Sequence, residues 1–160
     1  MVVGDIMDRD LTSLAEETSL LEAISLMALH GTSGFPVVNA AGHVVGFLSE
    51  QDILRAVIPG YFGYMDENFI MPDVTRIKGM VKRVGRDPAR EYMTKDCIVF
   101  EEEETISNAM MQMFRKNIRR APVVQEGMLV GMVDREEILR GFVHDNFAEG
   151  EVEIPIMSAK

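Results

Sequence analysis

The sequence predicts an α+β fold built from two copies of one β-α-β-β-α unit. The stretch GFPVV at 34–38 aligns with RAPVV at 120–124, and GFLSEQDILR at 46–55 aligns with GMVDREEILR at 131–140. Apolar residues also change from helical spacing to short strand-like runs at matching places in both copies. The predicted domains are therefore a first repeat at 1–58, an inserted connector at 59–89, a second repeat at 90–145 and a tail at 146–160.

Each copy opens with a short apolar strand and a helix. The strands are predicted at 11–14 and 97–100. Ser19 begins a capping-box pattern before the first helix, and Thr105 is a matching cap before the second. Behind each cap, apolar residues recur every three or four positions, which is typical of a helix with one buried face.

Two strands and a closing helix complete each copy. The strands are separated by turns that contain Gly42 and Gly127, because glycine allows the backbone conformation of a tight turn. The predicted strands are 35–39 and 43–49 in the first copy and 121–125 and 128–134 in the second, and the closing helices lie near 50–57 and 135–144.

The connector at 59–89 is aromatic in its first half and helical in its second. Val74, Ile77, Val81 and Val84 form one apolar stripe at helical spacing, and the polar positions between them are locally basic. The aromatic part is either a partner surface or lid, or a segment that packs over the repeats; it contains Tyr61, Phe62, Tyr64 and Phe69.

Composition excludes several classes of protein. Of 160 residues, 47% are hydrophobic, which is enough for a core, and no apolar run reaches the roughly 18 residues that favour a membrane helix. The formal net charge of −10 would repel nucleic acid. The single Cys97 allows no internal disulfide, and we expect a cytoplasmic protein. The sequence has no nucleophile–base pair, glycine-rich phosphate loop or metal-ligand cluster, so we expect no enzyme.

The two aligned copies resemble a pair of CBS domains, named after cystathionine β-synthase, a tandem called a Bateman module. The resemblance rests on the Pro-Val-Val strands, the Val-Gly-apolar strands and the Ile-Leu-Arg helices, and it covers about 110 of the 160 residues. It implies two repeats packed about a pseudo-twofold axis and a homodimer in the form of a disc. It also implies regulatory binding of an adenosine-containing ligand between the repeats, with no required cofactor.

In such a family the motif Gly-apolar-x-Ser/Thr-x-x-Asp marks a nucleotide cleft, and residues 46–52 fit it. A carboxylate at Asp52 accepts hydrogen bonds from ribose hydroxyls, and a hydroxyl at a helix N-terminus favours a phosphate. The same Ser-x-x-Asp spacing also fits a simple capping box, so Asp52 alone leaves both interpretations open. The nucleotide-binding residues implied by the resemblance are Phe47, Ser49, Gln51, Asp52, Cys97, Ile98, Ile118, Arg119 and Arg120.

The corresponding cleft of the other copy departs from the motif. Asp134 stands where the hydroxyl is expected, and Glu137 stands where the ribose acid is expected. Because of these two acids, we expect the second cleft to bind phosphates poorly and to take a neutral or cationic ligand, such as S-adenosylmethionine, or nothing.

The two arginines predicted for the first cleft need not act together. Strand alternation places Arg119 and Arg120 on opposite faces, so one of them can meet nearby acids instead of a ligand.

The predicted function is a stand-alone regulatory module that binds AMP, ADP or ATP in one cleft and signals to a partner protein. One alternative is a dimerisation or scaffold protein whose clefts are vestigial. Another is a sensor of an S-adenosylmethionine-type ligand.

Overall fold

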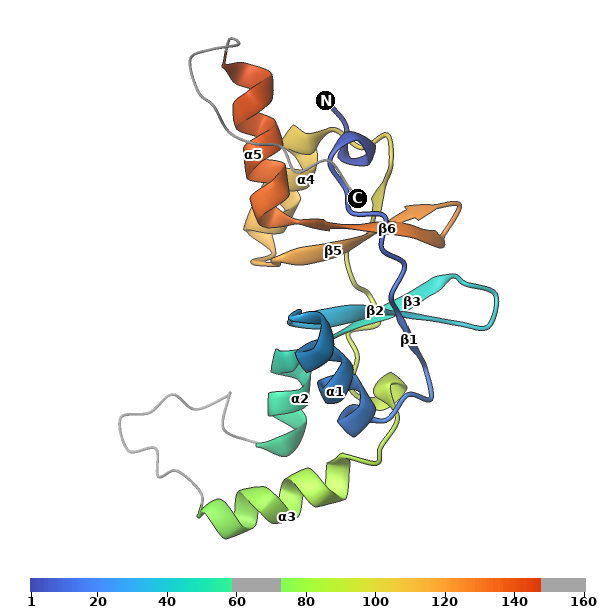
Figure 1. Cartoon of the computed structure of the whole chain (residues 1–160), viewed down its shortest axis with the longest axis vertical. Coiled ribbons are helices and arrows are strands. Elements are labelled where there is room, and N and C mark those ends of the chain that lie inside the picture. The colour runs from blue at the N-terminus through green and yellow to red at the C-terminus, as the bar shows by residue number, and fades with distance from the viewer. Residues whose placement is uncertain (59–72, 148–160) are drawn as a thin grey trace. The chain divides into compact units, whose positions relative to one another are not determined.

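The computed structural model describes residues 1–58 and 73–147, which form two compact units (Figure 1). Among these residues, one unit contains 13–40, 45–58 and 73–96, and we call it the Asp52 unit. The other contains 1–12, 41–44 and 97–147, and we call it the Asp134 unit. The predicted aromatic cluster at 61–69 and the tail from 148 lie outside the described residues.

The Asp52 unit contains a three-stranded sheet in the order β1-β2-β3, with β1 parallel to β2. Its helices include α3, the helical half of the connector. In chain order the elements are β1 (Leu14–Ala15), α1 (Leu20–His30), β2 (Gly34–Val38), β3 (Val44–Ser49), α2 (Glu50–Val57), α3 (Val74–Val84) and the 3-10 turn η2 (Ala89–Glu91).

The Asp134 unit repeats this plan. Its sheet has the order β4-β5-β6, with β4 parallel and β6 antiparallel to β5. In chain order its elements are the 3-10 turn η1 (Val3–Asp5), β4 (Phe100–Glu101), α4 (Ile106–Arg115), β5 (Arg120–Gln125), β6 (Met128–Asp134) and α5 (Arg135–Asn146). The predicted β-α-β-β-α order and the α+β fold class are therefore confirmed.

The predicted helix caps are present in both units. The Ser19 hydroxyl accepts a hydrogen bond from the Glu22 amide at 3.2 Å, and the Thr105 hydroxyl accepts one from the Asn108 amide at 3.3 Å. Each bond satisfies one of the amides that a helix start leaves unpaired.

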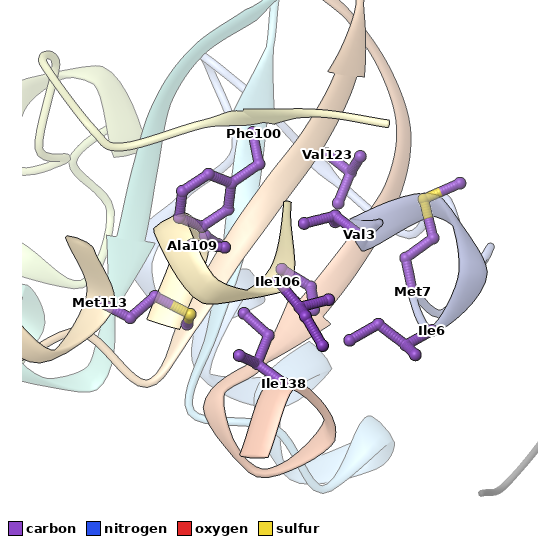
Figure 2. Packing of buried hydrophobic residues seen from close by; sticks show 11 residues of the cluster. Val3, Ile6, Met7, Phe100, Ile106, Ala109, Met113, Val123 and Ile138 are labelled. Atoms are coloured by element: carbon purple, nitrogen blue, oxygen red, sulfur yellow. The ribbon is translucent and has the colours of Figure 1, made fainter. Parts of the chain in front are cut away.

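Each unit has its own hydrophobic core. Figure 2 shows the core of the Asp134 unit, to which η1 and the two residues that follow it contribute together with the helices and the sheet: Val3, Ile6, Met7, Phe100, Ile106, Ala109, Met113, Val123 and Ile138. In the Asp52 unit, side chains of α1, β2, β3 and α2 pack with Val84 of α3 and Ala89 of η2. The connector helix is thus part of this unit's fold.

The compact units do not coincide with the sequence repeats. The Val3 amide donates to the Glu104 carbonyl at 2.8 Å, so the start of the chain packs with the second repeat. The Ala89 amide donates to the Thr18 carbonyl at 2.7 Å, so the end of the connector packs with the first. Each unit therefore includes the segment that precedes the other repeat. The predicted domain limits follow chain order and stay a prediction.

Two sequence expectations differ in detail. The opening strands begin later than predicted, at Leu14 and Phe100, and Leu11 is 54% exposed. Val74 belongs to the predicted apolar stripe of the connector, yet it is exposed because it is the first residue of α3 and lies beyond the core that Val84 reaches.

Candidate functional site

The start of α2 holds the central pair of the predicted site, Ser49 and Asp52. The Asp52 Oδ2 atom accepts hydrogen bonds from the Ser49 amide at 2.8 Å and from the Ser49 hydroxyl at 2.9 Å. The Asp52 amide in turn donates to the Ser49 hydroxyl at 3.3 Å. The pair is therefore a capping box, which is the structural interpretation that the sequence left open.

Capping does not use the whole Asp52 carboxylate. The Oδ1 atom has the Thr94 hydroxyl at 3.5 Å and an Arg55 guanidinium nitrogen at 3.7 Å, both longer than a strong hydrogen bond. Asp52 is nevertheless 8% exposed, and among the described residues it is the one buried charged side chain. Burying a carboxylate costs free energy unless its oxygens are hydrogen-bonded. Because the contacts of Oδ1 are long, this oxygen can accept a hydrogen bond from a further donor.

Phe47 lies beside this pair in a tightly fixed position. Its backbone exchanges two hydrogen bonds with Thr94, at 3.0 Å and 2.9 Å. Its ring packs against Gly34, where a Cβ atom would lie 2.6 Å from the ring. The ring is half-buried, and Gln51 is exposed on the first turn of α2. The first four predicted site residues thus lie at the end of β3 and the start of α2.

An open pocket of about 600 Å³ borders Asp52 within the same unit. Arg55 and Arg83 bring positive charge to it, and Asp87 and Glu91 bring negative charge. The Tyr92 hydroxyl donates to Asp87 at 2.6 Å, and this hydrogen bond, together with burial, raises the pKa of Tyr92 to about 12.

Of the residues that line this pocket, Asp52 is the one for which the sequence predicted a role in the site. Their lining role comes from the packing of α2 against α3 and the segment before η2, which brings together positions far apart in the chain. The one available signal was Arg55, three residues after Asp52 on the same helix.

The other five predicted residues belong to the Asp134 unit. Ile98 and Ile118 are partly buried and pack against its core, and Cys97 is half-buried. Arg119 is exposed, while its carbonyl accepts the Arg135 amide at 2.8 Å. The structure therefore gathers the nine predicted residues into two groups, four in one unit and five in the other.

Arg120 has a partner within its own unit. Its Nε atom lies 3.5 Å from Asp134 Oδ1, because the two residues stand opposite each other on β5 and β6. This pair matches the alternative in which one arginine meets a nearby acid. Arg119 and Arg120 thus differ: one is exposed, and the other is held beside a carboxylate.

Asp134 and Glu137 start α5 as Ser49 and Asp52 start α2. Glu137 accepts a hydrogen bond from the Asp134 amide at 2.9 Å. Burial raises the pKa of both carboxyls, although the Arg120 guanidinium opposes the rise at Asp134 and the amide hydrogen bond opposes it at Glu137. Two acids whose ionisation already costs free energy make this helix start unfavourable for a phosphate.

Two other features bear on the class of protein. Among the described residues, no group of three or more His, Cys, Asp or Glu side chains is arranged to hold a metal ion. Within 1–58 and 73–147, no helix combines the length and the apolar character needed to cross a membrane.

A known family model identifies the family to which this chain belongs. The CBS domain model matches residues 3–59 and 89–144, once for each repeat. The chain belongs to the CBS domain family. The two matches make it a tandem CBS pair, as its duplicated pattern predicted.

Several proteins and solved structures resemble the chain over most of its length. MJ1426 of Methanocaldococcus jannaschii is 29% identical over 158 residues, covering 89% of this chain and 92% of that protein, whereas the chain spans 41% of another, longer relative. The structure of CBSX2 from Arabidopsis thaliana in complex with AMP is 21% identical, with a TM-score of 0.69, covering 91% of this chain and 98% of that one. The CBS pair of MJ0100, solved with methylthioadenosine and S-adenosylmethionine, is 23% identical, with a TM-score of 0.66 and coverage of 91% and 98%.

Proposed function

We propose that this CBS pair is a regulatory module that binds an adenine nucleotide and signals the binding event to a partner protein. The observation that carries the proposal is the buried Asp52 carboxylate: its Oδ1 atom makes only long contacts within the described chain, and the residue lines an open pocket.

A ribose diol suits this carboxylate. Its two adjacent hydroxyls are donors, and a charged acceptor strengthens each hydrogen bond to about 1.5–3 kcal/mol net. The Ser49 capping box holds the carboxylate in place before a ligand arrives, so little ordering is needed on binding. CBSX2 was solved with AMP and MJ0100 with two adenosine derivatives, and adenosine is what those ligands share.

Recognition of the phosphate is assigned to Arg119. Its side chain is exposed, and no ion pair involves it in the described part of the chain, whereas Arg120 lies beside Asp134. An arginine fork binds two phosphate oxygens at once. The family resemblance implies that Phe47, Cys97, Ile98 and Ile118 supply apolar contacts to the base. The homodimer and the regulated partner belong to the same proposal.

The test is a thermal-shift and calorimetric titration of the protein with AMP, ADP, ATP, methylthioadenosine and S-adenosylmethionine, with and without Mg²⁺. A nucleotide at about one hundred times its Kd stabilises the folded state by about 2.7 kcal/mol. For a chain of this size we expect Tm to rise by roughly 5–11 °C. Unchanged Tm and no heat with every adenosine compound would refute the proposal.

One substitution and a matched control test whether Arg119 binds the phosphate. Arg119→Ala should weaken AMP binding at least tenfold and leave methylthioadenosine, which lacks a phosphate, within about twofold. Arg115→Ala is the matched control, since Arg115 is also exposed and lies four residues earlier, at the end of α4. Equal effects of both substitutions on AMP would remove Arg119 from the site.

A second candidate is a sensor of an S-adenosylmethionine-type ligand. The acids Asp134 and Glu137 favour it, because they repel a phosphate and suit a neutral or cationic group. Strong stabilisation by S-adenosylmethionine, lost in Glu137→Gln and retained in Asp52→Asn, would support this candidate over the nucleotide sensor.

A further inference from the structure

The connector helix α3 concentrates positive charge in an acidic protein. Residues 73–90 contain six Lys or Arg and two Asp, a net charge of +4, so the rest of the chain carries −14. Five of the six basic side chains, Arg76, Lys78, Lys82, Arg83 and Arg86, lie on α3 or just after it, and all five are exposed.

Packing fixes which face of α3 is exposed. Ile77, Met80, Val81 and Val84 contact the core of the Asp52 unit, and the Leu21 amide of α1 donates to the Gly85 carbonyl at 3.0 Å. Figure 1 shows α3 lying across the ends of α1 and α2 within this unit. The helix is therefore anchored on one side, and its opposite side presents the basic residues to the solvent.

Gly79 occupies the middle of the exposed face. At 100° per residue it lies between the Lys78–Lys82 side and the Arg76–Arg83 side. A Cβ atom at Gly79 would meet nothing within 4 Å, so the fold as described does not require glycine there. Glycine inside a helix costs about 1 kcal/mol relative to alanine. Without a side chain, Gly79 leaves the helix backbone uncovered between two rows of cations, so another backbone can approach closely.

Ion pairing distinguishes these five cations from other arginines in the described part of the chain. Arg9, Arg90 and Arg140 each form an ion pair with a glutamate, whereas no ion pair of the described residues involves the five cations on and after α3. A basic face on which the described residues form no ion pair is complementary to an acidic partner.

We propose that the exposed face of α3 is a docking surface for an acidic polypeptide segment of a partner protein. Eleven helical residues extend about 16 Å, which an extended segment of roughly five residues matches. A polypeptide suits the surface better than a longer polyanion does. A nucleic acid or an anionic membrane would extend beyond this short face toward the acidic remainder of the protein, which repels it. The proposal identifies where a partner binds and does not rest on nucleotide binding.

The test is fluorescence anisotropy with a labelled twelve-residue peptide of alternating Glu and Ser, and with its Gln–Ser counterpart. We expect the wild-type protein to bind the Glu peptide at least tenfold more tightly than the Gln peptide at 50 mM salt. Raising the salt to 300 mM should weaken binding severalfold, since exposed charges are screened. Equal affinity for both peptides, or none for either, overturns the proposal.

Three variants localise the effect. Lys78→Glu/Lys82→Glu should lose at least tenfold in affinity, whereas the control Lys95→Glu/Lys116→Glu, with the same charge change at exposed positions elsewhere, should stay within about twofold. Gly79→Leu should bind at least fivefold more weakly with an unchanged or higher Tm, because the added side chain blocks close approach to the helix backbone while its Cβ meets nothing within 4 Å. Equal losses in both double variants would mean diffuse charge attraction, and full binding by Gly79→Leu would rule out close approach of the peptide at Gly79.

Two further measurements discriminate among partners and mechanisms. Tighter binding of a single-stranded oligonucleotide or of phosphatidylserine vesicles than of the Glu peptide would overturn the choice of a polypeptide. Asp52→Asn should bind the Glu peptide as the wild type does, so a failed nucleotide site and a failed docking surface give different results. Loss of peptide binding in Asp52→Asn would contradict the independence of the two surfaces.

Discussion

Replacing Asp52 with alanine separates the capping role of this residue from ligand binding. The substitution removes two short hydrogen bonds from Ser49, at 2.8 Å and 2.9 Å, and two longer contacts with Thr94 and Arg55. Loss of a cap costs about 1 kcal/mol, and partly buried bonds to a charged acceptor raise the total to about 2–3 kcal/mol. For a chain of this length, Tm should fall by roughly 4–12 °C.

Glu137→Ala is the matched control because Glu137 occupies the same position in the other repeat. It accepts one amide hydrogen bond at 2.9 Å, and burial raises the pKa of its carboxyl, so the wild-type anion is already held at a cost. Its loss should therefore lower Tm by less than the loss of Asp52 does. Denaturant unfolding at pH 7 gives the two free energies of unfolding directly.

The decisive measurement is the ligand response of the two variants. We expect AMP to stabilise the wild type and Glu137→Ala equally and to leave the Tm of Asp52→Ala unchanged. If Asp52→Ala loses stability and still shows the full AMP shift, then the carboxylate is only a helix cap. The same result would show that the Asp52 Oδ1 atom does not bind the ligand.

Three other perturbations test the structure. Gly34→Ala should lower the free energy of unfolding by about 2 kcal/mol, because its Cβ would lie 2.6 Å from the Phe47 ring and 2.9 Å from a backbone oxygen; an unchanged denaturation midpoint would contradict this packing. The pKa of Tyr92 is raised from 10.0 to about 12 by its hydrogen bond to Asp87, so stability should fall as pH rises between these values. Absorbance at 295 nm should show one late-titrating phenol that is absent in Tyr92→Phe. Burial raises the pKa of Asp134, so wild-type stability should decline from acidic to neutral pH relative to Asp134→Asn; parallel pH profiles would show that this carboxyl is not perturbed.

Local signals predicted most of the secondary structure. Ser19 and Thr105 cap helices as expected, and Gly42 and Gly127 adopt φ values of +85° and +80° in the turns between strands. These features depend on neighbouring residues, so a pattern in the sequence is enough to identify them. The grouping of segments into units depends on long-range packing, which explains why the exchange of the opening segments was not predicted.

The sequence could not identify the partner of Arg120, because that partner depends on the register of β5 and β6. A regular continuation of the register of Gln125 with Met128 would set Arg120 opposite Val133. The register shifts between Val123 and Val124, as at a β-bulge, and this one-residue slip brings Asp134 opposite Arg120. Alternation left open which arginine would meet an acid, and the bulge decides it.

The starts of α2 and α5 show which features of these helices the fold requires. Both α2 and α5 begin with an acid that accepts the amide three residues before it, so either acid is sufficient for capping. The fold therefore does not explain why one repeat has Ser49 with a buried aspartate while the other has Asp134 with a glutamate. In the second repeat, Arg120 lies beside the extra carboxylate within the same unit. In the first, the acid keeps one oxygen with only long contacts, beside a pocket. That difference favours one nucleotide site per chain over two, and a calorimetric stoichiometry of two AMP per chain would contradict it.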